Sequence, residues 1–169
     1  EPLMEQLVLD LAPPPDPTLD NFVAGSNAGA LAALRSALAG QEPVVFLWGE
    51  TGSGKSHLAR AFVRDALKSG LEARYLHASR IHAFDTSMLQ ILALDEVDVL
   101  DPDGQLLAFD AINRLRLAGG ILLATGRLAP VDLALREDLR TRLGAGIVRQ
   151  LTPLNEAEKR AALAAHASS

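Results

Sequence analysis

The sequence predicts an α/β domain in which a five-stranded parallel sheet lies between helices. Short apolar runs of strand length alternate along the chain with longer segments in which apolar residues recur at helical spacing. The run at 44–48 (VVFLW) is apolar throughout, which is typical of a strand buried on both faces. Strands that alternate with helices build a parallel sheet that helices cover on both sides.

The elements are expected in a fixed order. Ser26 or Asn27 caps a first helix, which Gly40 ends. The predicted strands are residues 44–48, 72–77, 89–94, 119–126 and 147–151. The predicted later helices are residues 56–68, 105–118 and, for the most part, 131–142. The segment 78–88 shows no readable pattern, so we assign no element to it.

The chain divides into an arm, a linker and a core. Residues 1–12 form the arm, and its segment 6–11 (QLVLDL) has leucine at every second position. Four prolines make residues 13–18 a stiff, extended linker. Residues 19–154 form the core, and residues 155–169 begin a further helix. We interpret the arm as a tethered peptide ligand, an edge strand of its own domain, or a segment for self-association.

Composition narrows the class of protein. A chain of 169 residues with 49% hydrophobic content is long enough to form one domain with a substantial core. Its net charge of −5 argues against a general affinity for DNA or acidic membranes. It has no cysteine, and we find neither a membrane span nor a signal peptide, so we expect a cytoplasmic protein.

The strongest chemical signal is the segment GETGSGKS. It follows a predicted strand and opens a predicted helix, which is the context that a phosphate-binding loop requires. Glycines let backbone N–H groups turn toward a phosphate, the lysine reaches the β- and γ-phosphates, and the last hydroxyl binds Mg²⁺. The predicted nucleotide-binding residues of the loop are Gly49, Glu50, Thr51, Gly52, Ser53, Gly54, Lys55 and Ser56.

An acidic pair follows the predicted strand 89–94. Asp95 and Glu96 stand where the carboxyl end of a parallel strand meets the phosphates. We expect Asp95 to hold Mg²⁺, partly through water and together with Ser56, and Glu96 to orient the attacking water. The loop after them, residues 98–104 (DVLDPDG), is interpreted as a turn, because it lacks the closing glutamate of a calcium loop.

Two further sites come from the second half of the core. Thr125 ends the fourth predicted strand, where it either bonds the γ-phosphate or the lytic water or merely completes the strand. Arg140 and Arg142 close a helix away from the chain's own nucleotide. Such an arginine serves a nucleotide held by a neighbouring molecule, or it simply stabilises the helix dipole.

Five stretches together resemble the sequence boxes of the DnaA-type AAA+ ATPases. They are TLDNFVAGSNAGALAAL, FLWGETGSGKSHLARA, ILALDEVDVL, LLATGRLAP and LRTRLGAGIVRQLTPLNEAEK, and they extend from residue 18 to residue 163. The resemblance implies an AAA+ P-loop NTPase core that binds ATP or ADP with Mg²⁺ and hydrolyses it slowly alone. It places Asn21, Phe22 and Val23 at the adenine, Asp95 and Glu96 in the Walker B pair, Thr125 at sensor 1, and Arg142 as the arginine finger.

Regulatory members of this family carry an N-terminal hexapeptide, Gln-Leu-x-Leu-x-Leu, that docks on the sliding clamp. The match implies that Gln6, Leu7, Leu9 and Leu11 bind the DNA polymerase III clamp (beta subunit). It also implies that the chain inhibits replication initiation by promoting hydrolysis of DnaA-bound ATP. The alternatives are a DnaA-like or helicase-loader ATPase, and a clamp-binding adaptor whose nucleotide site is structural.

The chain also departs from the family pattern. Nothing in it resembles the DNA-binding helix-turn-helix domain of DnaA, so we expect little direct DNA binding. The sequence stops at Ser169, inside the first lid-like helix, and we therefore expect the helical lid to be largely absent. Arg127 falls where the family often has an acidic residue.

Overall fold

The computed structural model describes residue 19, residues 27–153, residues 155–158 and residue 160. The predicted arm and linker (1–18) and the predicted adenine pocket (21–23) lie outside these residues, as does most of 155–169. In chain order the longer elements are α2 (Ala28–Leu38), β1 (Val44–Trp48), α3 (Lys55–Lys68), β2 (Ala73–His77), β3 (Ile91–Asp95), α4 (Pro102–Leu117), β4 (Ile121–Gly126), α5 (Glu137–Leu143) and β5 (Ile147–Gln150).

The five strands form one sheet in the order β2-β3-β4-β1-β5, and every neighbouring pair is parallel. This confirms the predicted fold class. Leu47 of β1 is paired with Thr125 of β4, and His77 of β2 is paired with Asp95 of β3. The carboxyl ends of β1, β3 and β4 therefore meet at one edge of the sheet, which is where α/β proteins bind ligands.

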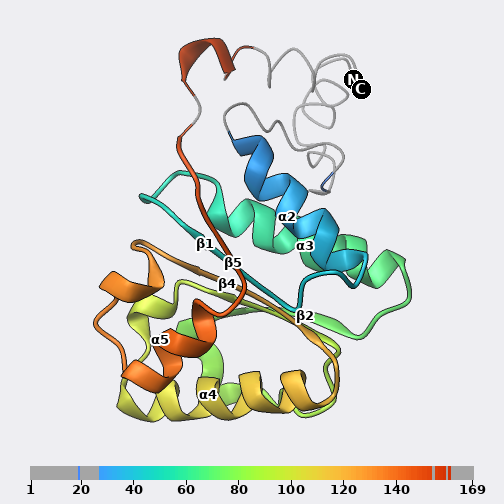
Figure 1. Ribbon diagram of the computed structural model, residues 1–169, viewed down its shortest axis with the longest axis vertical. Helices are drawn as coiled ribbons and strands as arrows, with labels where there is room; N and C mark the ends of the chain where they lie inside the picture. The colour runs from blue at the N-terminus through green and yellow to red at the C-terminus, as the bar shows by residue number, and fades with distance from the viewer. Residues whose placement is uncertain (1–18, 20–26, 154, 159, 161–169) are drawn as a thin grey trace, which may run out of the picture.

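Helices cover both faces of the sheet, with α2 and α3 on one side and α4 and α5 on the other (Figure 1). The apolar strand β1 contributes to both layers, because successive side chains of a strand point to opposite faces. Phe46 packs in the cluster that contains α4 and α5, whereas Val45 and Leu47 pack against α2 and α3. All three are fully buried, which contributes about 1.5–3 kcal/mol each.

The segment predicted as mostly helical, residues 131–142, was only partly right. A single 3₁₀ turn covers Pro130–Asp132, and the α-helix α5 begins at Glu137. Leu133 and Leu135 between them are both buried. Residues two apart lie on the same side of an extended chain but on nearly opposite sides of a helix, so burying both leucines requires the extended form.

Other boundaries also differ from the predictions. Helix α4 begins at Pro102 rather than at residue 105, because Asp101 caps it by accepting a hydrogen bond from the Gly104 N–H (2.6 Å). The unassigned segment 78–88 contains a 3₁₀ helix, Ala78–Ala83, whose start is capped by the His77 ring.

The predicted cap of the first helix was half right. Asn27 precedes α2, but its side chain makes no capping hydrogen bond there. Its amide instead donates to the Thr152 carbonyl and accepts from the Thr152 N–H, each at 2.9 Å. The Asn27 side chain therefore bonds the distant Thr152 backbone instead of capping α2.

Within the part of the chain that the structure describes, no helix combines the length and the apolar character needed to cross a membrane.

Candidate functional site

The loop between β1 and α3 forms the first part of the site. Gly52 (φ 87°) and Gly54 (φ 98°) adopt left-handed backbone conformations that other residues rarely take. The Lys55 side chain is buried, and its Nζ donates to the carbonyls of Gly49 (2.5 Å) and Glu50 (3.1 Å). The ammonium group is thus held by loop carbonyls, at the start of the helix where the motif expects phosphates.

Gly49 lies where three strands end. Its N–H donates to the Gly126 carbonyl at the end of β4 (3.1 Å). A Cβ atom here would stand 2.4 Å from the Leu151 carbonyl oxygen and 2.9 Å from the Ser53 hydroxyl. Only glycine fits at this position. The close approach and the hydrogen bond to Gly126 together hold the loop against the sheet edge.

Asp95 is the centre of the site. Its carboxylate is fully buried and accepts hydrogen bonds from three hydroxyl groups on three different elements. Ser56 of α3 donates at 2.6 Å, Tyr75 of β2 at 2.5 Å and Thr125 of β4 at 2.5 Å. Neighbouring strands deliver two of these donors, because β3 runs between β2 and β4. The structure therefore brings together Ser56, Asp95 and Thr125, which the sequence predicted at one site.

Glu96 follows Asp95 in a strained backbone conformation. With φ 59° and ψ 60° it is the only non-glycine residue with a positive φ in the described chain. Its N–H donates to the Thr125 hydroxyl (2.9 Å), and its carboxylate oxygen lies 3.6 Å from Lys55 Nζ. Such strain persists where the surroundings enforce it, commonly at functional sites. The turn aims the carboxylate at the phosphate loop.

Tyr75 is a site residue that the sequence reasoning missed. Burial raises the pKa of its phenol above the usual 10.0, and the hydrogen bond to the Asp95 carboxylate raises it further. The Arg60 guanidinium lies over the ring, 4.5 Å from its centroid, and opposes this shift. The missing signal was strand order: nothing local in the sequence shows that β2 lies beside β3.

The donor set fits Mg²⁺. The Ser56 hydroxyl and the Asp95 carboxylate are hard oxygen donors that already lie 2.6 Å apart. Mg²⁺ keeps several waters and takes its remaining ligands from substrate phosphates, so two protein oxygens suffice. Among the described residues no group of three or more His, Asp or Glu could hold a metal ion by itself. A metal here would therefore depend on a bound nucleotide.

The acidic stretch 98–104 after β3 is not a calcium site, but it is only partly the predicted turn, since it contains the end of a 3₁₀ helix (Val97–Val99) and the start of α4. Asp101 caps α4, and Asp98 accepts from the Arg127 N–H with both carboxylate oxygens (3.1 Å each). The Asp98 and Asp101 carboxylates thus accept hydrogen bonds from the backbone N–H groups of Arg127 and Gly104.

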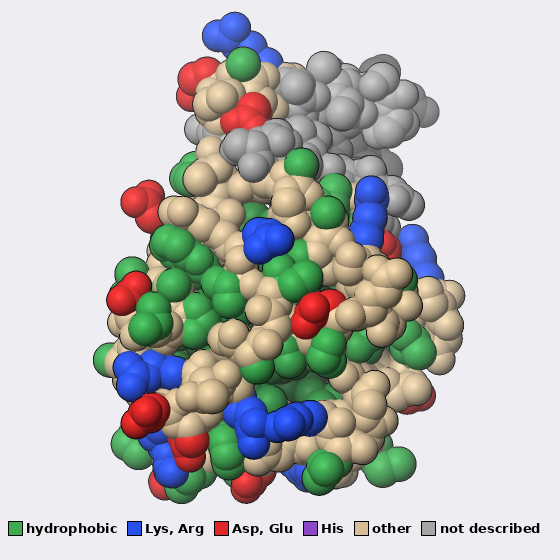
Figure 2. Space-filling view, in the orientation of Figure 1, with side chains coloured by type: hydrophobic (Ala, Val, Ile, Leu, Met, Phe, Trp, Pro, Cys, Tyr) green, Lys and Arg blue, Asp and Glu red, His purple; other side chains and the backbone are tan. Residues whose placement is uncertain are grey.

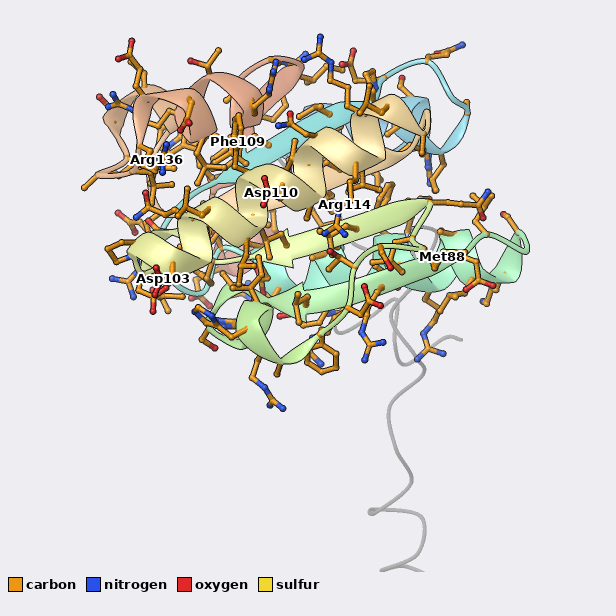
Figure 3. All side chains as sticks on the ribbon, turned by 90° about the horizontal axis from the view of Figure 1, so that it is seen from below. Met88, Asp103, Phe109, Asp110, Arg114 and Arg136 are labelled. Carbon is orange, nitrogen blue, oxygen red and sulfur yellow. The ribbon has the colours of Figure 1, made fainter. Side chains whose placement is uncertain are left out.

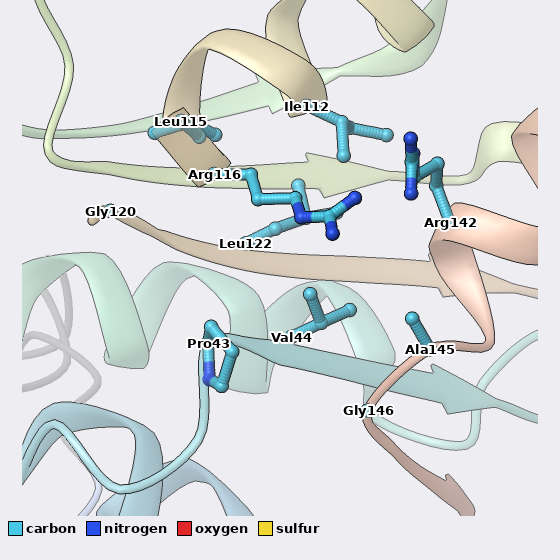
Figure 4. A pocket seen from close by; sticks show the side chains of 10 residues that line it. All are labelled: Pro43, Val44, Ile112, Leu115, Arg116, Gly120, Leu122, Arg142, Ala145 and Gly146. Atoms are coloured by element: carbon cyan, nitrogen blue, oxygen red, sulfur yellow. The ribbon is translucent and has the colours of Figure 1, made fainter. Parts of the chain in front are cut away.

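Arg142 lies at the opposite edge of the sheet from the phosphate loop. It lines a pocket of about 200 Å³ together with Val44, the first residue of β1, whereas the phosphate loop follows the last residue of β1 (Figure 4). Its half-buried guanidinium lies over the Phe109 ring, 5.8 Å from the centroid. Arg140 points elsewhere and donates to the Leu133 carbonyl (3.5 Å). Arg142 is therefore separated from the chain's own phosphate loop, and the sequence predicted this separation.

Comparisons with known proteins agree with this geometry. A family model described as "AAA ATPase domain" matches residues 29–166. An uncharacterised protein of Haemophilus influenzae is 32% identical over 166 residues, which cover 92% of this chain and 72% of that protein.

Two solved structures of the replication initiator DnaA are also similar. One, bound to AMPPCP and single-stranded DNA, has a TM-score of 0.76 at 25% identity and covers 83% of this chain. The chain spans about half its length (51%). The other, domain III of Thermotoga maritima DnaA, has a TM-score of 0.80 at 22% identity and covers 91% of this chain and 75% of that one. The similarity to domain III of Thermotoga maritima DnaA shows that the two chains share a fold. The chain belongs to the AAA ATPase domain family, with a core that is similar to domain III of DnaA.

Proposed function

We propose that the chain binds an adenine nucleotide with Mg²⁺ at the loop between β1 and α3. The observation that carries this proposal is the convergence of Lys55, Ser56, Asp95 and Glu96 at one sheet edge. A similar DnaA structure is bound to AMPPCP, an ATP analogue, which supports the same ligand class. Asn21, Phe22 and Val23 would contact the adenine.

The residues of the site have separate roles in this proposal. Lys55 leaves the loop carbonyls and pairs with the β- and γ-phosphates, while Ser56 and Asp95 hold the metal, partly through water. Mg²⁺ held by Ser56 and Asp95 would supply positive charge that stabilises the charge of the phosphate groups. Glu96 orients the attacking water, and Thr125 fixes both Asp95 and the Glu96 backbone.

We further propose a cytoplasmic regulator of the Hda type, which restrains replication initiation by promoting hydrolysis of DnaA-bound ATP. The supporting observation is the position of Arg142 at the opposite edge of the sheet from its own phosphate loop, so that a nucleotide which it contacts would belong to another molecule. The arm residues Gln6, Leu7, Leu9 and Leu11 would hold the sliding clamp. Three buried leucines offer about 1.5–3 kcal/mol each before ordering costs, enough for a reversible contact.

A second candidate is a DnaA-like or helicase-loader ATPase that uses its own hydrolysis. The proximity of Glu96 to Lys55 favours it, because the parts for hydrolysis in cis are assembled. This function predicts salt-sensitive DNA binding by the isolated chain. A third, a clamp adaptor with a structural nucleotide site, predicts that Lys55→Ala changes stability but no hydrolysis in any mixture with partners.

The test is hydrolysis of labelled ATP on DnaA in the presence of DNA-loaded clamp and this chain. We expect Arg142→Ala to reduce the stimulation about 10³-fold or more, as loss of an arginine finger does, while clamp pull-down is unchanged. Arg140→Ala is the matched control, since it removes the same charge from the same helix and should retain stimulation. Gln6→Ala/Leu7→Ala should lose the clamp. Stimulation that survives Arg142→Ala would refute the trans-acting role.

A further inference from the structure

The pocket that Arg142 lines contains a second arginine. Arg116 in the last turn of α4 and Arg142 in the last turn of α5 border the same pocket of about 200 Å³ (Figure 4). In the close view Arg116 extends toward the side of the pocket where Arg142 stands, and Ile112, Leu122 and Val44 lie around the two side chains. The two cations therefore converge from two separate helices.

Neither guanidinium has an acidic partner among the described residues. The ion pairs found there are Lys55–Glu96, His82–Asp101 and Arg136–Asp138, and no hydrogen bond of either guanidinium to a described residue is present. Arg114, two residues earlier in α4, differs: it points to the other side of the helix and donates to the Thr86 hydroxyl (3.2 Å). With no ion pair to a described residue, both guanidinium groups can pair with an anion from outside the chain.

The pocket floor strengthens the attraction for an anion. Val44, Ile112, Leu115 and Leu122 line it, and of these Ile112, Leu115 and Leu122 are buried in the core. Apolar walls lower the local dielectric constant, so charge interacts more strongly there than in water. The space-filling view shows basic side chains bordering a hollow lined by apolar ones in the lower half of this face (Figure 2).

Phe109 holds one of the cations in place. It packs against the core from α4, and the Arg142 guanidinium lies over its ring. Phe109 and Arg114 lie on opposite sides of α4, as the view from below shows (Figure 3). Phe109 and Arg116 of α4 thus lie toward Arg142 and the pocket, whereas Arg114 lies on the other side of the helix and bonds Thr86.

We propose that Arg116 is a second phosphate-binding arginine, and that it acts with Arg142 on the nucleotide of a neighbouring AAA+ molecule. This inference rests on the proposed trans-acting function of Arg142. The ligand class is a terminal phosphate of a nucleoside triphosphate: it carries several oxygens, each able to accept from a guanidinium fork. Its charge matches the two guanidinium groups, which a single carboxylate would leave half neutralised.

The test separates Arg116 from Arg142 in the hydrolysis assay with DnaA, clamp and labelled ATP. At saturating chain, Arg116→Ala should lower the rate constant of stimulated hydrolysis about 10- to 100-fold, and Arg116→Lys should retain part of the rate. Arg114→Ala is the control from the same helix and should keep the wild-type rate. Melting temperature and ADP affinity of Arg116→Ala should match wild type, because the Arg116 side chain is exposed and forms no ion pair with a described residue.

Three outcomes would overturn the inference. A wild-type rate for Arg116→Ala, with stimulation lost in Arg142→Ala, would leave the proposed function standing and remove Arg116 from the site. A change only in the chain concentration at half-saturation would place Arg116 on the partner's surface instead of its phosphate. Wild-type rates in both variants would refute the inference and the proposed function together.

Discussion

Tyr75 shows how a single residue completes the site. Its hydroxyl shares the Asp95 oxygen Oδ2 with the Ser56 hydroxyl, while Thr125 occupies Oδ1. Asp95 and Ser56 were predictable because each belongs to a local pattern with a known spacing. Tyr75 was not, since a tyrosine in a strand is ordinary until the neighbouring strand is known.

Tyr75→Phe is expected to reduce the free energy of unfolding at pH 7 by about 1 kcal/mol, through loss of one hydrogen bond to a carboxylate. The folded-state pKa of Tyr75 lies above 10.0, so its contribution is complete below pH 10 and declines as pH rises through the folded pKa. Urea unfolding across pH 7 to 11 should show that the difference in free energy of unfolding between wild type and Tyr75→Phe becomes smaller at alkaline pH. As the only tyrosine, Tyr75 can also be titrated directly by tyrosinate absorbance. Equal stability at pH 7 would contradict the role given to this bond.

At the scale of elements, helix and strand identities followed from the sequence more reliably than their ends. The apolar run of β1 and the helical spacing in α3 and α4 were sufficient to identify these elements. The start of α4 was missed because its cap, Asp101, stands in a loop rich in aspartates that all looked equivalent. The extended stretch before α5 was missed because the burial of Leu133 and Leu135 is a property of the packed core.

Asp101→Ala should lower the melting temperature by about 2–4 °C, since it removes the N-cap of α4. The Gly104 N–H, and secondarily His82, hold the pKa of Asp101 below 3.8. The charged cap therefore stabilises above that pH, and its contribution is lost as pH falls through the folded pKa. Asp101→Asn, which keeps a capping oxygen, is the control and should lose less. Thermal unfolding followed by circular dichroism checks both, and an Ala variant that melts like the Asn variant would contradict the cap.

At the scale of the whole molecule, strand order decides which residues meet. The order β2-β3-β4-β1-β5 places Asp95, Thr125 and Gly49 at one edge, and the Tyr75 hydroxyl reaches Asp95 from the neighbouring strand β2. The end of the core is joined to its beginning by Asn27 and Thr152, which are 125 residues apart in sequence. Asn27 is 3% exposed, so its amide is committed to this contact.

Asn27→Ala is therefore expected to reduce the free energy of unfolding by about 1–2 kcal/mol, because both hydrogen bonds to the Thr152 backbone are lost. Thr152→Ala retains those backbone groups but removes the longer bond from the Thr152 hydroxyl to the Asn27 amide oxygen (3.4 Å), so it should reduce stability less than Asn27→Ala does. Urea unfolding of the two variants makes the comparison. Equal losses in both would show that the side chain of Thr152, and not its backbone, carries the contact.

The sequence by itself determined the phosphate loop, the Asp95–Glu96 pair and the α/β class. Each depends on residues close together in the chain, where spacing and local backbone preference set the structure. Only the tertiary structure decided that Tyr75 reaches Asp95, that Asn27 binds Thr152 instead of capping α2, and that Arg116 shares a pocket with Arg142. These contacts join segments that are distant in sequence, and packing between strands and helices, rather than local preference, brings them together.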